Sequence, residues 1–136
     1  MILFICNGNV ARSQIAEELY KMKTKRNAQS AGTKVKLEKN GIKLIDDGEF
    51  AVNAANNFKE ITGIDISNNT RKMITEELFK KAEMIIIMAD KDTLPEYTKF
   101  YENKIEYWNL KDPKKYDLEG YKEIIKEINE KISKLV

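Results

Sequence analysis

The sequence contains no histidine, one cysteine and two prolines among its 136 residues. Without histidine, the chain cannot carry a Ser-His-Asp triad, a Cys-His protease site or an HExxH zinc site. Because Cys6 is the only cysteine, no disulfide can form within the chain and no group of thiolates can hold a metal. We therefore expect no metal site and no cofactor, and any chemistry at Cys6 must be activated by something other than histidine.

A strong charge bias and a long apolar run are also missing. Lys and Arg number 24 against 22 Asp and Glu, and this balance predicts neither nucleic acid nor a membrane as an obligatory partner. The longest apolar run, residues 84–89, is too short to span a bilayer. The first residues lack the basic segment and the cleavage site of a signal peptide, so we expect a cytoplasmic protein. Length and a hydrophobic share of 42% predict one domain over residues 1–136.

Short apolar runs alternate with amphipathic segments along the chain. The helical spacing of apolar residues distinguishes the predicted helices from the strands. In the first predicted helix, Met22 is expected on the apolar side. Gly63 is a predicted helix C-cap and Thr75 a predicted N-cap. Strands are expected at 1–5, 27–31, 84–88 and 104–108, helices at 13–25, 50–62, 76–81 and 118–135, and a loop at 34–49. The alternation predicts an α/β fold in which a parallel sheet of four strands is covered by helices on both faces.

Ligands of such folds bind outside the carboxyl ends of the strands. The first predicted strand ends at Cys6, and the chain beyond the fourth leads to Asp112. The topology alone therefore places these two residues at one crevice.

The segment Cys6-Asn7-Gly8-Asn9-Val10-Ala11-Arg12-Ser13 joins the first predicted strand to the first predicted helix. Backbone N–H groups of such a loop, together with the helix N-terminus, form a cradle for an anion. Arg12 adds a planar fork that grips two oxygens of a phosphate-like group, and the positive field favours the thiolate of Cys6. Taken alone, Cys6 is typical of a small buried residue and Arg12 of a solvated helix start. Their combination with Gly8 and Ser13 favours a nucleophilic site.

The motif C-x5-R-S in CNGNVARSQIAEEL resembles the low-molecular-weight protein tyrosine phosphatases and, equally, the thioredoxin-coupled arsenate reductases of the same fold. The similarity extends over nearly the whole chain, through Ser30-Ala31-Gly32-Thr33, GIDIS at 63–67, MIIIMADKD at 84–92 and Asp112-Pro113. It implies the three-layer fold of that family.

The resemblance also implies roles for individual residues. Cys6 would attack phosphorus to form a cysteinyl-phosphate, and Arg12 with the loop amides would stabilise the phosphoryl oxygens in the transition state. Asp112 would serve as general acid for the leaving group and then as base for water, on a loop made rigid by Pro113. Asn9 and Ser13 would hold the loop and tune the thiolate.

Phosphatase and arsenate reductase activity start from the same thiolate and oxyanion pocket. The thioredoxin-coupled reductases need two further cysteines, which this chain lacks, so a reductase would depend on an external thiol. The run SQIAE is more similar to the reductases. The chain nevertheless lacks the cysteines that would pass on the disulfide, which is a required step of that reaction. We therefore favour hydrolysis of a phosphorylated protein or small phosphate ester over reduction of arsenate.

Two further points stay open at this stage. Family members usually carry aromatic residues directly after Asp-Pro, where this chain has Lys114-Lys115 and only then Tyr116, and no aromatic follows Thr33 closely. An aromatic wall for phosphotyrosine is therefore not evident. A third interpretation is a non-catalytic module that binds an oxyanion or phosphopeptide, but binding alone needs neither Cys6 nor Asp112.

Overall fold

The computed structural model describes residues 1–136, which form one sheet of four strands in the order β2-β1-β3-β4. The strands are β1 (Ile2–Cys6), β2 (Ala28–Gly32), β3 (Met84–Ile87) and β4 (Ile105–Tyr107). All three neighbouring pairs are parallel, and Ile2 lies opposite both Ala28 and Met84. Since parallel strands share one direction, their carboxyl ends meet at a single edge of the sheet.

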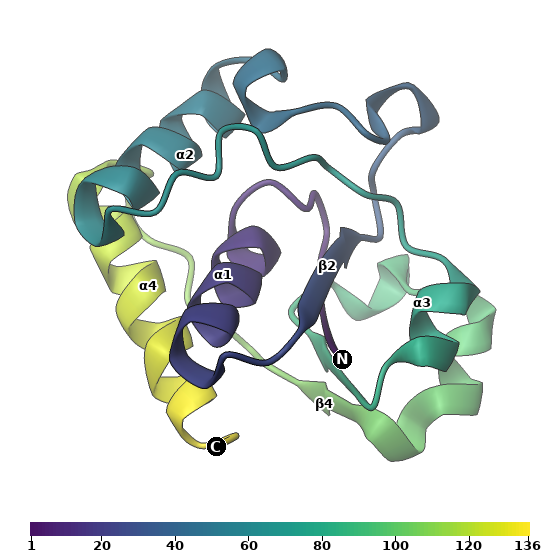
Figure 1. The fold of residues 1–136 in the computed structure, drawn as a ribbon. Helices are drawn as coiled ribbons and strands as arrows, with labels where there is room; N and C mark the ends of the chain where they lie inside the picture. The colour runs from purple at the N-terminus through teal and green to yellow at the C-terminus, as the bar shows by residue number, and fades with distance from the viewer.

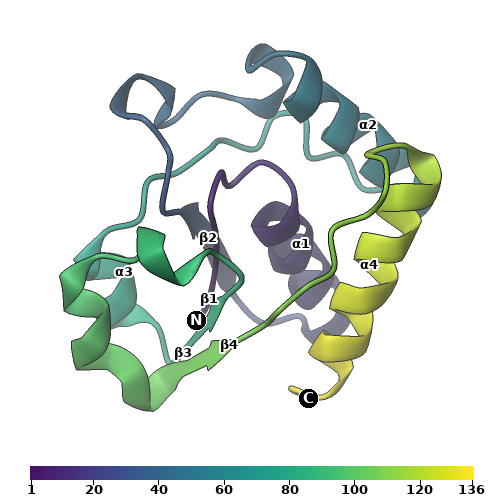
Figure 2. The same ribbon diagram turned by 180° about the vertical axis from the view of Figure 1, so that it is seen from behind.

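Helices cover both faces of this sheet, as the sequence predicts (Figures 1 and 2). Helices α1 (Arg12–Thr24), α2 (Glu49–Thr62) and α4 (Leu118–Ser133) lie on one side. Helix α3 (Glu76–Lys81) and a long 3-10 helix, Glu96–Lys104, lie on the other. The predicted three-layer α/β class is confirmed.

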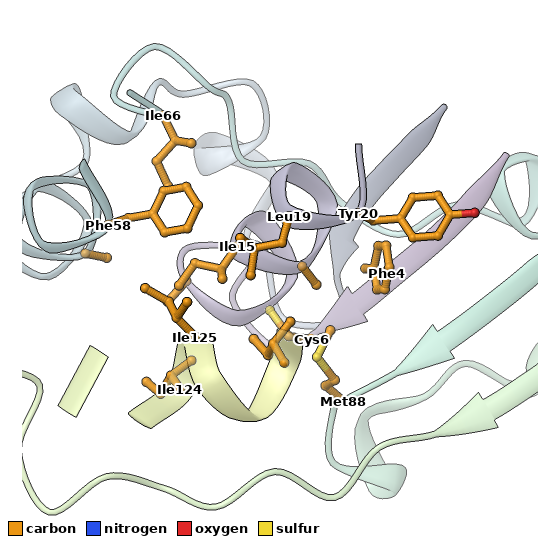
Figure 3. Close-up of a cluster of buried hydrophobic side chains, with 14 of the residues drawn as sticks. Phe4, Cys6, Ile15, Leu19, Tyr20, Phe58, Ile66, Met88, Ile124 and Ile125 are labelled. Atoms are coloured by element: carbon orange, nitrogen blue, oxygen red, sulfur yellow. The ribbon is translucent and has the colours of Figure 1, made fainter. Parts of the chain in front are cut away.

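Alternate residues of β1 enter two separate cores, because successive side chains of a strand point to opposite faces. Phe4 and Cys6 belong to the larger core, which α1, α2 and α4 cover. Figure 3 shows Phe58, Ile15 and Ile125 meeting there from three different helices. Leu3 and Ile5 belong to the smaller core beneath α3. The uninterrupted apolar run of β1 thus reflects burial on both of its faces.

Most element boundaries agree with the sequence pattern to within two residues. Thr75 accepts a hydrogen bond from the Leu78 N–H at 3.3 Å, and Gly63 ends α2 with a φ of 79°, so both predicted caps are confirmed. Segment 34–49 is mainly loop, with 3-10 turns at Leu37–Lys39 and Leu44–Asp46.

One expectation about packing is wrong, and one element was not predicted. Met22, placed on the apolar side of the first helix, is 50% exposed because it lies on the face turned away from the sheet. Between Pro95 and the fourth strand, where the sequence analysis predicts no particular element, the 3-10 helix Glu96–Lys104 runs. Tyr97 and Tyr101 of that helix pack edge-on against Phe79, which gives the smaller core its outer layer.

Some features that bear on function classes can be read directly from the structure. None of the helices combines the length and the apolar character that crossing a bilayer requires. No group of three or more His, Cys, Asp or Glu side chains is placed to hold a metal ion.

Candidate active site

The loop between β1 and α1 curls around its own side chains at the carboxyl edge of the sheet. Asn9 adopts a left-handed conformation with a φ of 53°, which an asparagine tolerates better than most residues. Its side chain is fully buried, as is that of Ser13. Gly32 of the neighbouring strand lies so close that a Cβ there would come within 2.6 Å of the Asn7 carbonyl oxygen. The loop is therefore seated tightly on the end of β2.

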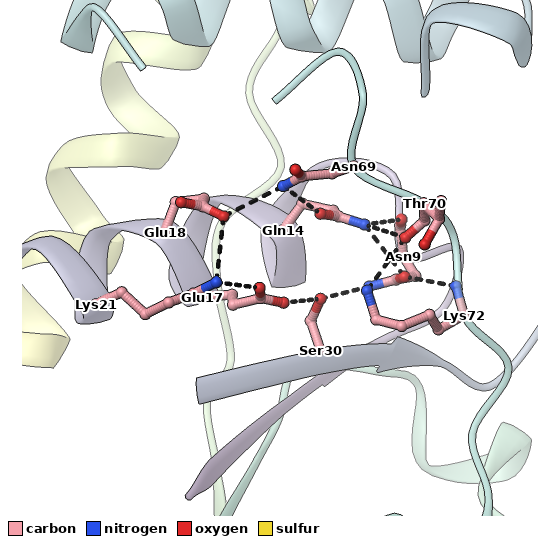
Figure 4. Close-up of polar contacts among 9 residues, drawn as sticks. All are labelled: Asn9, Gln14, Glu17, Glu18, Lys21, Ser30, Asn69, Thr70 and Lys72. Carbon is pink, nitrogen blue, oxygen red and sulfur yellow. Dashed lines mark hydrogen bonds and ion pairs between the residues drawn. The ribbon is translucent and has the colours of Figure 1, made fainter. Parts of the chain in front are cut away.

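Asn9 is the centre of a buried hydrogen-bond network (Figure 4). Its Nδ2 donates to Ser13 Oγ at 2.8 Å and to Ser30 Oγ at 3.0 Å. Its Oδ1 accepts from the Lys72 N–H at 2.8 Å and from Gln14 Nε2 at 3.2 Å. Every hydrogen-bonding position of this amide is used, which defines both its orientation and the course of the loop.

The sulfur of Cys6 lies within reach of two donors of the loop. The Asn9 N–H donates to Sγ at 3.1 Å, and Ser13 Oγ lies 2.9 Å from it. Because Ser13 Oγ already accepts from Asn9, its own proton is free to point at the sulfur. Cys6 is 7% exposed, with that exposure directed into a cavity. Two donors directed at one sulfur stabilise a thiolate more than a thiol.

The structure brings Asp112 to Arg12 across one hundred residues of chain. The guanidinium Nη2 of Arg12 donates to Asp112 Oδ1. Arg12 is the first residue of α1, with 23% of its side chain exposed, whereas 77% of the Asp112 side chain is exposed. All three residues expected to carry chemistry thus lie at one edge of the sheet.

The cavity above Cys6 has a volume of about 360 Å3. All the loop residues from Cys6 to Arg12 line it except Asn9, which is buried behind the loop. Phe50 and Tyr116 line the same cavity, with ring centroids 5.2 Å apart and planes at 67°. A second cavity of about 450 Å3 adjoins it, sharing Arg12 and including Asp112.

The pair of rings corrects the expectation that no aromatic wall is evident. Tyr116 reaches the cavity although two lysines separate it from Asp112-Pro113. Phe50 comes from the start of α2, far from either motif, and is half exposed there. The signal that could have found Phe50 is its place on that helix, where it falls outside the apolar stripe formed by Ala51, Ala54 and Phe58.

Two other polar residues at the site were assigned no role from the sequence. Asp90, which follows β3, exchanges two hydrogen bonds with the side chain of Asn7, at 2.9 Å and 3.0 Å. Arg71 donates from Nε to the Gly8 carbonyl oxygen at 2.9 Å. Both contacts tie the loop to segments more than sixty residues away.

Burial displaces the pKa of two groups behind the site. It lowers the pKa of the Lys72 ammonium, against the opposing effect of Glu17. It raises the pKa of Tyr121 to about 12, and nearby Tyr116 adds to this while Arg12 opposes it. Neither group touches the cavity of Cys6.

A larger groove of about 660 Å3 lies at the opposite end of the sheet, around Met1, Arg26 and Glu83. It has no nucleophile. The chemistry-bearing residues are therefore gathered at the carboxyl edge, where ligands of parallel α/β sheets bind.

A cysteine thiol and an arginine on one tight loop, with a carboxylate beside them, define a cysteine-dependent enzyme that acts on an oxyanion. Comparison with known proteins gives the particular family. The family model described as low molecular weight phosphotyrosine protein phosphatase matches residues 1–136, and the chain belongs to this family.

Relatives named as phosphatases and relatives named as arsenate reductases have similar sequence identity to this chain. An arsenate reductase from Brevibacillus brevis is 30% identical, over 98% of this chain and 91% of its own. The crystal structure of a low molecular weight protein tyrosine phosphatase from T. tengcongensis is 31% identical with a TM-score of 0.78, over 98% and 95% of the two chains. A thioredoxin-dependent arsenate reductase from Corynebacterium glutamicum has a TM-score of 0.67 at 26% identity, over 98% and 58%. The family thus includes both phosphatases and arsenate reductases.

Proposed function

We propose that this protein is a cytoplasmic phosphate-monoester hydrolase that acts through a cysteinyl-phosphate intermediate. The observation that carries the proposal is the meeting of Cys6, Arg12 and Asp112 at one edge of the sheet, where Arg12 lines both the cavity of Cys6 and the adjoining cavity of Asp112. The backbone N–H groups of Asn7, Gly8, Val10 and Ala11 donate to no acceptor within the protein, so they are available for the oxygens of a phosphoryl group.

The reaction proceeds in two displacements at phosphorus. The Cys6 thiolate forms the S–P bond while the P–O bond to the leaving group breaks, and the Asp112 carboxyl gives its proton to the departing oxygen. Arg12 and the loop amides hold the phosphoryl oxygens as charge redistributes. The Asp112 carboxylate then takes a proton from water, which attacks phosphorus and releases phosphate and the thiolate. Ser13 donates its hydrogen bond to the sulfur each time the negative charge returns to it.

The aromatic pair supports an aryl phosphate as substrate. Phe50 and Tyr116 line the cavity on the side open to solvent, where a ring attached to the phosphate would lie. Offset or edge-to-face contact with such a ring contributes about 0.5–1.5 kcal/mol beyond its area burial. Lys114 and Lys115, directly after Pro113, gave no indication of an aromatic wall. Phe50 and Tyr116 supply one, so the cavity suits phosphotyrosine.

The second candidate is arsenate reduction, favoured by the relatives that are named arsenate reductases. The same loop would bind arsenate and Cys6 would form the first adduct. No second cysteine is present to resolve it, so an external small thiol or a partner's thiol would be required. Hydrolysis needs only water, which is why we place it first. A module that merely binds an oxyanion is third.

The test is turnover of 4-nitrophenyl phosphate at mildly acidic and neutral pH, with Cys6→Ser measured alongside. We expect turnover by the native chain and none by the variant, while both bind inorganic phosphate. Undiminished turnover in Cys6→Ser would rule out the covalent mechanism. A folded native chain that binds phosphate without turning over would redirect the test to arsenate with added thiols, and failure there would leave the binding module.

A further inference from the structure

Arg71 contacts the proposed phosphate-binding loop, residues 6–13. It belongs to a segment that contributes no residue to the proposed reaction. Its Nε donates to the Gly8 carbonyl oxygen at 2.9 Å, and its Nη1 donates to Asp47 Oδ2 at 2.9 Å. The side chains of Arg71 and Asp47 are 13% and 5% exposed, so this ion pair is largely shielded from water.

Arg71 is itself firmly held by the backbone. Its N–H donates to the Ile42 carbonyl at 2.9 Å, and its carbonyl accepts from the Gly41 N–H at 2.7 Å. Lys39 pairs with the other oxygen of Asp47 at 3.0 Å. Segment 34–49, which the sequence pattern leaves as an uninformative loop, therefore supplies the anchor that orients the Arg71 guanidinium.

The carbonyl that Arg71 contacts belongs to the same peptide unit as the donor to the nucleophile. This unit joins Gly8 to Asn9: its C=O receives the Arg71 Nε–H, and its N–H donates to the Cys6 sulfur at 3.1 Å. A charged donor on the oxygen of an amide polarises that amide and strengthens its N–H as a donor. It also prevents the peptide from flipping, which would turn an oxygen toward the sulfur.

We propose that Arg71 is a positioning residue which, through the Gly8–Asn9 peptide, holds and strengthens the N–H donor to Cys6 and so favours its thiolate. Asp47 orients Arg71 and at the same time offsets part of its charge. The site thus has two arginines with different tasks: Arg12 faces the substrate, and Arg71 acts from behind the loop.

This inference rests on Cys6 being the nucleophile of the proposed function. The charged groups around the cavity of Cys6 are Arg12 and Asp90, with Asp112 beyond Arg12, and Tyr116 is its titratable aromatic. Lys39 and Asp47 are the charged partners that contact Arg71 and its anchor. A substitution at Arg71 alone changes the charge of none of these groups' side chains.

The experiment measures the rate at which neutral iodoacetamide alkylates Cys6 as a function of pH. Since Cys6 is the only cysteine, the adduct is unambiguous by intact mass. We expect Arg71→Gln to raise the midpoint of the pH profile by about half a pH unit. Arg71→Lys, which restores the charge, should bring it back toward the native value. Arg26→Gln, the same change at the opposite end of the sheet, is the matched control and should leave the midpoint unchanged.

Asp47→Asn distinguishes electrostatics from mere loop support. Asparagine keeps an oxygen acceptor for Arg71 but removes the negative charge, so we expect the midpoint to fall. An unshifted midpoint in Arg71→Gln overturns the proposal, and so does a rise in both variants, which would indicate that Arg71 only supports the loop. If Arg71→Gln does not fold, Asp47→Asn alone decides: a midpoint that is unchanged or higher contradicts the proposal.

The outcome is separable from that of the proposed function. The function fails if Cys6→Ser still turns over phosphate esters. The role of Arg71 fails if the alkylation midpoint does not move in an enzyme whose turnover depends on Cys6.

Discussion

The two loops that form the candidate site are built in opposite ways. The loop proposed to bind phosphate, residues 6–13, is held from within, with Asn9 and Ser13 fully buried and their hydrogen bonds complete. The loop that carries Asp112 lies on the surface, and the Asp112 side chain makes one hydrogen-bonded ion pair, with Arg12. The candidate site therefore combines a rigid loop around Cys6 with an exposed carboxylate in the adjoining cavity.

This difference matches the demands of the two chemical tasks. A cradle for a phosphoryl group works because its donors are already oriented and cost no reorganisation during reaction. A general acid must reach the leaving group and afterwards water, which requires solvent access. The acid loop is anchored at its end, where Asp117 caps α4 through the Gly120 N–H at 2.9 Å and Asn53 donates to the Tyr116 carbonyl at 2.8 Å.

The largest effect is expected from opening the buried network. Asn9→Ala removes one hydrogen bond each from the Ser13 and Ser30 hydroxyls and the hydrogen bond of the Lys72 N–H, and it places alanine at a positive φ. We expect the free energy of unfolding to fall by about 2–4 kcal/mol and kcat to fall roughly 100-fold. Urea unfolding and 4-nitrophenyl phosphate kinetics measure both. Asn57→Ala, a half-buried asparagine of α2, is the control; equal losses in the two variants would contradict a special role for Asn9.

The acid loop should respond in activity and not in stability. Asp112→Asn keeps an acceptor for Arg12 but cannot supply a proton. We expect hydrolysis of phenyl phosphate to slow about 100-fold, that of 4-nitrophenyl phosphate far less, and the free energy of unfolding to change by under about 0.5 kcal/mol. The comparison uses kcat for the two leaving groups. Equal slowing of both would remove the general-acid role.

Gly120 of α4 determines how closely the loop that carries Asp112 packs against this helix. A Cβ on Gly120 would come within 1.8 Å of the Lys115 carbonyl oxygen, so Gly120→Ala must push that loop outward. We expect about a tenfold loss of activity on phenyl phosphate and a loss of about 1–3 kcal/mol in stability. Glu119→Ala, on the same turn but exposed, is the control. If Gly120→Ala kept the native ratio of activities on phenyl phosphate and 4-nitrophenyl phosphate, Asp112 would be positioned independently of α4.

The smallest effect is expected beneath both loops, at Tyr121. Its hydroxyl is buried without a hydrogen-bond partner, so Tyr121→Phe should leave kcat unchanged and raise stability by about 1 kcal/mol or less at neutral pH. In the native chain the pKa of Tyr121 is about 12, against about 10 for an unfolded tyrosine. The protonated Tyr121 is therefore favoured in the folded state, and its contribution to the free energy of unfolding is complete below pH 10. That contribution is lost as the pH rises toward 12.

The variant should lose less stability over that alkaline range, as urea unfolding at pH 8, 10 and 11 would show. Tyr101, whose pKa is also raised to about 12 by its hydrogen bond to Glu76, contributes equally in both proteins. A variant that loses as much stability as the native chain over this range would refute the assignment to Tyr121.

The reliability of sequence reasoning differs between the same two regions. Cys6, Arg12 and Ser13 are recognisable because a strand, a loop and a helix follow one another directly in the chain. Asp112 is found because it follows a strand whose carboxyl end shares the edge of Cys6, and because Asp112-Pro113 belongs to the family resemblance. The part of Phe50 in the site is not predicted, since an exposed side chain at the start of a helix looks much the same whether or not it faces a cavity. Asp90 lies in the segment 84–92 of the resemblance, but the sequence assigns it no contact.

Misjudged packing has a similar cause. Met22 fits the helical spacing of its neighbours, and only the position of the sheet decides that it faces solvent. The 3-10 helix Glu96–Lys104 follows from tyrosines that pack on Phe79, a contact between segments that no local pattern contains.

The sequence by itself determined the α/β class, the parallel sheet and the loop with its thiol and arginine, because these depend on residues that are neighbours in the chain. Apart from Asp112, the tertiary structure alone decided which distant residues complete the site. It brought the Phe50 and Tyr116 rings together and placed Arg71 behind the Gly8–Asn9 peptide. Such contacts depend on how helices and loops pack over the sheet, and packing involves the whole chain at once.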